Sequence, residues 1–152
     1  MKIVLYRPQI PQNCGNIVRT CAVTGSSLCL VGPMGFSTSD RWLKRAGLDY
    51  WEGVIVEQTD SLDQVLEAAT GNIHFLSSKA SKSYSDVQYG PNDLLIFGSE
   101  TEGLPEELHE KWGEHFRTIP MIPGQRCLNL ATSVGIVVYE AWRQQNFAAS
   151  KA

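Results

Sequence analysis

Polar residues that could take part in catalysis or binding cluster directly after the first apolar segment of the chain. The stretch "IPQNCGNIVRTC" (10–21) places Asn13, Gly15, Asn16 and Arg19 around the expected start of a helix. Asn16 and Arg19 stand at i and i+3, which puts both on one face of that helix. A planar guanidinium at this position can hold a phosphate or a sugar oxygen through paired hydrogen bonds. Asn13 taken alone is also explained as the N-cap of the helix.

Three later segments each pass from an apolar run into small or turn-forming residues: "FLSSK" (75–79), "IFGSETEG" (96–103) and "TIPMIPG" (118–124). Gly98 and Gly103 let the backbone come close to a ligand, and the two prolines stiffen the third loop. Loops of this kind offer backbone N–H and C=O groups to a planar heterocycle. Each loop taken alone is better explained by turn geometry.

The last long helix is expected from about Cys127 to Gln145, and its first residues are unusually polar for so apolar a segment. Asn129 and Ser133 share one stripe at i and i+4, while most other positions are apolar. A helix that is apolar nearly all round is buried on most sides. We therefore expect it to lie between a sheet and a second subunit.

Several common sites are excluded by their missing motifs. No G-x-G-x-x-G follows the first strand, so the dinucleotide fingerprint is absent, and no Gly-Lys-Ser/Thr follows Gly103, which rejects a P-loop. No G-x-S-x-G nucleophile elbow is present. His74, His109 and His115 are scattered without a ligand pattern, so no metal site is expected.

The elements that position these residues alternate between strands and helices, which predicts an α/β fold with a mainly parallel sheet flanked by helices. In such sheets ligands bind outside the carboxyl ends of the strands. The expected strands are 2–6, 27–32, 53–57, 72–77, 93–98 and 115–120. Besides the last helix, we expect helices that begin after residues 11–13 and end at Gly25, that follow Ser39 or Asp40 and end at Gly47, that run from Asp60 to Gly71, and that hold Pro105 in the first turn.

Length and composition fit one domain of 1–147 with a frayed tail of 148–152. No apolar run is long enough to cross a bilayer and no signal peptide precedes the first strand, so a cytoplasmic protein without membrane contact is expected. The four cysteines lack C-x-x-C spacing and are expected to be reduced thiols. The net charge of −3 argues against non-specific coating of nucleic acid but allows a local RNA-binding patch.

Three stretches together resemble the motifs of the SPOUT RNA methyltransferases, in the family's order: "PQNCGNIVRTC", "LIFGSETEGLP" and "IPMIPGQRCLNLATSVGIVVYEAWRQ". The resemblance is closest to small single-domain tRNA 2'-O-methyltransferases of the TrmL (YibK) type and covers nearly the whole chain. It implies a fold whose C-terminal part is threaded into a trefoil knot, and a homodimer.

The resemblance also implies that S-adenosyl-L-methionine binds in a bent pose, mostly through backbone contacts, and leaves as S-adenosyl-L-homocysteine. Relatives often have serine where this chain has Cys127, so a side-chain contact there is open. Carried over by motif, together with the loop residues above, the expected cofactor-binding residues are Leu76, Ser77, Gly98, Gly103, Ile119, Cys127 and Leu128.

The implied reaction moves a methyl group from the sulfonium to a ribose 2'-hydroxyl of tRNA, with the wobble cytidine or modified uridine of leucine tRNAs as the expected target. Arg19, Asn16 and Glu100 are the expected catalytic residues. Because a guanidinium does not normally lose its proton, our hypothesis is that Arg19 orients the target phosphate and stabilises the forming alkoxide. Glu100 either holds Arg19 or shapes its loop; a plain helix-start carboxylate is the alternative.

The expected RNA contacts come from a few cations and one aromatic ring. Arg41, Lys44 and Arg45 share a helix face that is also explained as a solvated surface, and Tyr139 either stacks on a base or caps the core. The full set is Arg7, Arg41, Lys44, Arg45, Arg126 and Tyr139. The sequence also allows two alternative functions: a small-molecule-binding α/β protein of flavodoxin type, and a non-catalytic RNA-binding module.

Overall fold

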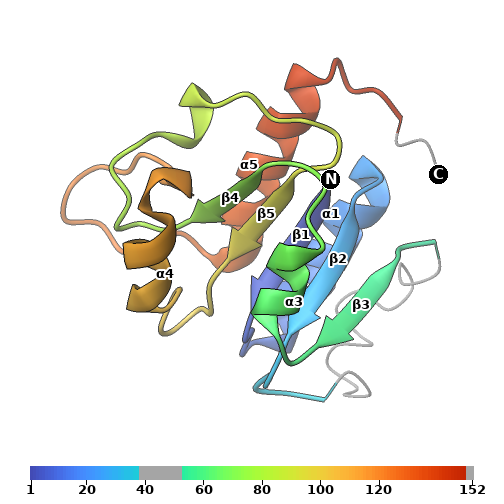
Figure 1. Ribbon diagram of the computed structural model, residues 1–152, viewed down its shortest axis with the longest axis horizontal. Coiled ribbons are helices and arrows are strands. Elements are labelled where there is room, and N and C mark those ends of the chain that lie inside the picture. The colour runs from blue at the N-terminus through green and yellow to red at the C-terminus, as the bar shows by residue number, and fades with distance from the viewer. Residues whose placement is uncertain (38–52, 150–152) are drawn as a thin grey trace.

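The computed structural model describes residues 1–37 and 53–149, which form a twisted sheet with helices on both faces (Figure 1). The strands are β1 (Lys2–Tyr6), β2 (Ser27–Val31), β3 (Val56–Thr59), β4 (Ile73–Leu76), β5 (Leu94–Phe97) and β6 (Phe116–Arg117). The helices are α1 (Pro11–Thr24), α3 (Leu62–Glu67), α4 (Glu106–Trp112) and α5 (Leu130–Gln144), with short 3-10 turns η2 (Tyr84–Asp86) and η3 (Gly113–His115).

Every strand pairing in the sheet is parallel, and the strand order is β3-β2-β1-β5-β4-β6. The expected α/β fold with a mainly parallel, helix-flanked sheet is therefore confirmed. The chain winds outward from β1 through β2 to β3 and then returns to build β4 and β5 on the other side. The order thus reverses between β1 and β5, and the carboxyl ends beside this point are where parallel sheets bind ligands.

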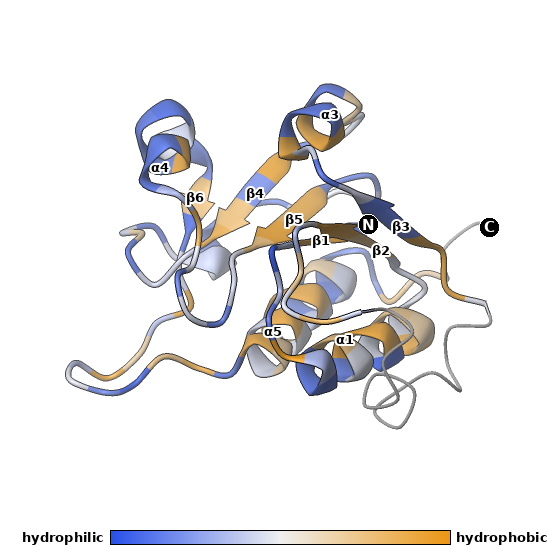
Figure 2. Cartoon of the chain, turned by 90° about the horizontal axis from the view of Figure 1, so that it is seen from below, coloured by the Kyte–Doolittle hydropathy of each residue, from blue (hydrophilic) through white to orange (hydrophobic). Residues whose placement is uncertain are grey.

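The helices cover the sheet as two layers (Figure 2). Helices α1 and α5 lie side by side on one face, and α3 and α4 cover the other. Two apolar clusters fill the spaces between the layers: one joins α1 and α5 to the sheet, the other joins α3 and α4 to its opposite face. The central strands are buried on both faces, which explains their nearly continuous apolar sequence.

Four strand predictions hold to within about one residue of the observed ends, and two are corrected. The predicted strand 53–57 is shifted: β3 begins at Val56 and continues through the exposed Glu57 to Thr59. It is an edge strand, so an apolar run was a poor guide to its bounds. The predicted strand 115–120 is only Phe116–Arg117, because Thr118 leaves the sheet to bond with Lys82 and Tyr84.

The predicted helix starts are also corrected. Helix α1 begins at Pro11, so Asn13 is not its N-cap; Ile10 holds that position. Helix α5 begins at Leu130, three residues later than expected, because the Asn129 side chain caps it by accepting from the N–H groups of Ala131 and Thr132.

Two further helix predictions are corrected, and a third concerns residues that the structure does not describe. Pro105 precedes α4 as its N-cap, and α3 is a single short helix capped by Ser61 rather than a segment from Asp60 to Gly71. The helix predicted between Ser39 and Gly47 lies outside the described residues.

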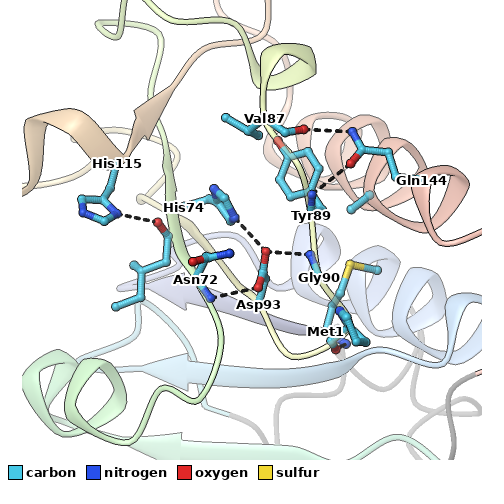
Figure 3. A network of polar contacts seen from close by, with 12 residues as sticks. Met1, Asn72, His74, Val87, Tyr89, Gly90, Asp93, His115 and Gln144 are labelled. Atoms are coloured by element: carbon cyan, nitrogen blue, oxygen red, sulfur yellow. Dashed lines mark hydrogen bonds and ion pairs between the residues drawn. The ribbon is translucent and has the colours of Figure 1, made fainter.

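A buried polar network joins β4 to the turn before β5 (Figure 3). It lies near the amino ends of these strands, away from their carboxyl ends. His74 Nε2 lies 2.9 Å from Asp93 Oδ2, and both side chains are buried. The same carboxylate accepts the N–H groups of Asn72 and Gly90. Tyr89 packs its ring against His74 and donates from its N–H to Gln144 of α5. This network therefore connects the amino-terminal ends of β4 and β5 to α5.

Candidate functional site

A cavity of about 530 Å³ opens at the carboxyl ends of β4, β5 and β6. Leu76, Phe97 and Leu104 are buried and give it apolar walls, while Ser77, Thr118 and Ser133 add hydroxyl groups. Mixed apolar walls with a few polar groups are typical of cofactor sites, and the volume lies in their usual range of about 300–1,000 Å³. All seven predicted cofactor residues line it: Leu76, Ser77, Gly98, Gly103, Ile119, Cys127 and Leu128.

The loop after β5 folds back on itself to form one wall of this cavity. The N–H of Gly103 donates to Ser99 O, and the N–H of Ser99 donates to Gly103 O, at 3.0 and 3.3 Å. A Cβ at Gly98 would collide with the backbone of Gly103. Glycine is therefore required at position 98 by the packing of its own loop, whatever ligand the cavity holds. Gly103 has φ +67°, a conformation that favours glycine.

Glu100 binds the start of α1 across this loop. Its carboxylate accepts the N–H groups of Gln9 at 2.8 Å and Ile10 at 3.1 Å, and Asn13 Nδ2 at 3.2 Å. A carboxylate at the positive end of a helix dipole is electrostatically favoured. These contacts support the shaping role that the sequence allowed for Glu100.

Asn13 extends the contact to the last helix. It is 5% exposed, and its Oδ1 accepts from Asn129 Nδ2 at 3.0 Å. One chain of side chains, Glu100–Asn13–Asn129, therefore links the β5 loop, α1 and the N-terminus of α5 around the cavity. The sequence placed Asn13 among the polar residues at this helix start and also allowed it to be the N-cap; the bond to Asn129 was not predicted.

Asn16 and Arg19 lie on the exposed side of α1 and do not line the cavity. Arg19 is six residues beyond Asn13, so it stands about 9 Å further along the axis and about 240° around it. The helix that brings Asn13 into the cavity wall thus directs Arg19 elsewhere. Of the three predicted catalytic residues, Glu100 lines the cavity of its own chain, and Asn16 and Arg19 do not.

The predicted RNA contacts occupy separate places. Arg126 is exposed at the rim of the cavity, and Arg7 lines a second cavity beside it. Tyr139 is 45% exposed on α5, with its ring edge-on to Trp142 at 5.7 Å, so it does not cap the core. Arg41, Lys44 and Arg45 lie outside the described residues.

His109 also lines the cavity, although the sequence gave it no role. Its ring stacks on Phe116 with centroids 3.9 Å apart, and Nε2 lies 3.5 Å from Ser77 Oγ. In isolation it was one of three scattered histidines, and no spacing rule connects it to Ser77.

Two kinds of feature are absent from the described residues. In 1–37 and 53–149 no group of three or more His, Cys, Asp or Glu residues could hold a metal ion. Within the same residues no helix has the length and apolar character needed to cross a membrane.

Comparison with known proteins gives consistent matches across the chain. Residues 1–139 match the SpoU rRNA methylase family. The tRNA (cytidine(34)-2'-O)-methyltransferase of Methylovorus glucosotrophus is 46% identical over 148 residues, 96% of each chain.

Solved structures agree with this match. One concerned with the 2-OH methylation of C/U34 on tRNA superposes with a TM-score of 0.88, at 42% identity and with 97% of each chain covered. An AdoMet-bound rRNA methyltransferase from Sinorhizobium meliloti gives a TM-score of 0.83 at 27% identity, over 93% of this chain and 55% of that one.

Proposed function

The chain belongs to the SpoU rRNA methylase family, and we propose that it methylates the ribose 2'-hydroxyl of nucleotide 34 in tRNA, using S-adenosylmethionine. The observation that carries this proposal is the cavity at the carboxyl ends of β4, β5 and β6, because residues from all three family-like motifs meet there. A cytidine or modified uridine at the wobble position of leucine tRNAs is the first substrate to test. Such a substrate, together with four free cysteines, is consistent with a cytoplasmic enzyme.

The cavity suits an adenosyl group in shape and chemistry. Leu76, Phe97 and Leu104 would pack against the adenine, and the backbone at Ile119, Cys127 and Leu128 would hydrogen-bond its edge. S-adenosylmethionine supplies a methyl group already activated by a sulfonium. The remaining task of the protein is to hold the acceptor hydroxyl in line with that methyl group, and positioning of this kind can contribute roughly 7–11 kcal/mol.

Arg19 is our candidate for the group that holds the acceptor. Its guanidinium would bind the target phosphate and stabilise negative charge on the 2'-oxygen as the hydroxyl loses its proton. Glu100 and Asn13 would act indirectly, by fixing the start of α1 and hence the direction in which Arg19 extends.

A homodimer would complete the site. Exposed apolar side chains lie on α1 and α5 and just after α5: Val23 at 55%, Tyr139 at 45% and Phe147 at 53%. Where exposed apolar side chains form a contiguous patch, they mark an interaction surface. Because Arg19 does not line the cavity of its own chain, we place it at the cavity of the second copy.

The decisive experiment incubates the purified protein with methyl-labelled cofactor and total tRNA, then maps the modified ribose. Label on the 2'-oxygen of nucleotide 34 is the expected result. Label on a base, on another nucleotide or on no tRNA would overturn the proposal. Light scattering of the same sample should give the mass of two chains.

A further inference from the structure

A second cavity, of about 480 Å³, lies beside the cofactor cavity and shares the wall formed by the loop 99–104. Its other side is formed by the chain that follows β1, with Tyr6, Arg7 and Gln9. Lys79, from the loop after β4, borders both cavities. The second cavity therefore places two cations next to the expected position of the methyl donor, in a lining that also holds the carboxylates of Glu102 and Glu106.

Arg7 is held in an unusual backbone conformation at this place. Its φ is +51°, in the left-handed region that non-glycine residues seldom adopt. Two hydrogen bonds fix it: the Arg7 N–H donates to Val31 O at 2.7 Å, and Gln9 Nε2 donates to Arg7 O at 2.9 Å. The guanidinium carbon lies 5.0 Å from the centroid of the Tyr6 ring. The cation is thus positioned by its neighbours while remaining exposed.

Lys79 is the second cation, and sequence reasoning did not single it out. Its Nζ lies 3.8 Å from a carboxylate oxygen of Glu106, and both side chains are about 70% exposed. Exposed pairs of this kind contribute little energy, so a stronger anion can displace the carboxylate. A phosphate group, with its several acceptor oxygens, is such an anion.

We propose that the second cavity binds a phosphodiester group of the RNA strand next to the methylated nucleotide, with Arg7 and Lys79 as its ligands. The inference rests on the proposed function, since it uses the position of the cofactor cavity to place the strand. An anchored flanking phosphate would fix the acceptor ribose relative to the shared wall. Phosphate contacts of this type set register and orientation on the nucleic acid.

The test compares tRNA binding and methyl transfer for charge-removing variants. Arg7→Asn suits the site, because asparagine tolerates a positive φ better than most residues. Lys79→Ala removes the second cation, and Lys111→Ala is the matched control, since Lys111 belongs to α4 but lines neither cavity. Binding is measured by fluorescence anisotropy with labelled tRNA over a range of salt concentrations. Calorimetry with S-adenosylhomocysteine checks that the cofactor cavity is intact.

Arg7→Asn and Lys79→Ala are each expected to weaken tRNA binding about three- to tenfold, with unchanged affinity for S-adenosylhomocysteine. The slope of log affinity against log salt should become shallower by about 0.7 for each phosphate that is no longer neutralised by a cation. A change in packing alone would leave this slope as it is. Glu106→Gln, which removes the competing carboxylate from Lys79, should bind tRNA more tightly.

Variants that bind tRNA as tightly as Lys111→Ala, or whose salt slope stays at the wild-type value, would overturn the inference. So would weaker binding by Glu106→Gln. The proposed phosphate subsite and the proposed methyl transfer can be refuted independently of each other. A wild-type protein that binds tRNA through Arg7 and Lys79 but transfers no methyl group would refute the proposed function and support the subsite. A wild-type protein that binds no tRNA would refute both.

Discussion

The side-chain nitrogen Nδ2 of Asn129 donates a hydrogen bond of 3.0 Å to Oδ1 of Asn13, although 116 positions separate the two residues. Asn129 caps α5 with its Oδ1, while Asn13 donates to Glu100 with its Nδ2. Each amide therefore uses its oxygen and its nitrogen toward different elements. The three residues join the ends of the chain at the cavity beside the carboxyl ends of β4, β5 and β6.

Asn13→Asp should disrupt this junction more than its size suggests. The substitution removes the donor to Glu100 and places a second carboxylate next to the first, in a buried position. We expect the free energy of unfolding to fall by about 2 kcal/mol, measured by urea denaturation at pH 7.5. Affinity for S-adenosylhomocysteine should fall as well, because repulsion between the two carboxylates would displace Glu100 and its loop, which line the cavity. Gln12→Ala, an exposed position on the same helix, serves as the control, and equal stability of the two variants would contradict this role.

Glu100→Ala should destabilise α1 from a distance of 90 positions in the sequence. The N–H groups of Gln9 and Ile10 would lose their acceptor, as in the loss of a helix cap, which costs about 0.5–2 kcal/mol. The measurement is thermal and urea unfolding beside Glu102→Ala, whose carboxylate belongs to the same loop. If Glu100→Ala lost methyl transfer while its unfolding curve matched that of the control, the positioning role would be wrong and a direct chemical one preferred.

The central strands could be predicted from the sequence because each is a short apolar run between turn residues. A strand that is buried on both faces is apolar almost throughout, so such a run marks it directly. The bounds of β3 could not be predicted in this way. It is an edge strand that carries polar residues such as Glu57 and Gln58, and its bounds depend on pairing with β2. The start of α5 was misplaced for a related reason. Cys127 and Leu128 fit a helix locally, but the side chain of Asn129 ends the loop.

The site shows the same division between local and distant information. The loops that line the cavity were identified because their small and turn-forming residues stand at strand ends, and family resemblance supplied the ligand. The bond between Asn13 and Asn129 depends on how α1 and α5 pack, which no spacing in the sequence encodes. The trefoil knot stays a prediction from resemblance.

The stability of the protein should decrease as the pH falls below about 6.5, in part because of His74. Burial lowers the pKa of this histidine from its usual 6.5, a shift that its bond to Asp93 and that carboxylate's charge oppose and the nearby Arg117 and His115 reinforce. The unfolded chain then binds a proton that the folded protein excludes, so the free energy of unfolding declines by up to about 1.4 kcal/mol per pH unit from this group.

The contribution of His74 can be isolated with His74→Gln, whose amide can still donate to Asp93 but does not titrate. Urea unfolding of both proteins at pH 7.5 and pH 5.5 gives the difference. We expect the wild-type protein to lose more stability than the variant between these two values. Parallel losses would show that other groups account for the acid sensitivity.

Cys127 should be the thiol that reacts in the native protein. Cys14 and Cys21 are buried, and burial raises the pKa of each thiol to about 12, while burial also raises the pKa of Cys29. Cys127 is exposed and lines the cavity where we propose that the cofactor binds. Iodoacetamide at pH 8 should therefore modify one cysteine per chain, as read by mass spectrometry, because the thiolate is the reactive form. S-adenosylhomocysteine should slow this reaction, and unchanged labelling in its presence would place the cofactor away from Cys127.

A complementation experiment tests whether Arg19 acts at the cavity of the second copy. Arg19→Lys retains charge but loses the paired donors, so its turnover should fall at least about tenfold. Cys127→Trp should block the cavity, which calorimetry with S-adenosylhomocysteine can verify. When the two impaired proteins are mixed and exchange chains, about half of the dimers are mixed, and each holds one unblocked cavity facing an intact Arg19. Methyl transfer should then recover to about a quarter of the wild-type rate, whereas a mixture that stays inactive despite proven chain exchange would mean that Arg19 serves its own chain.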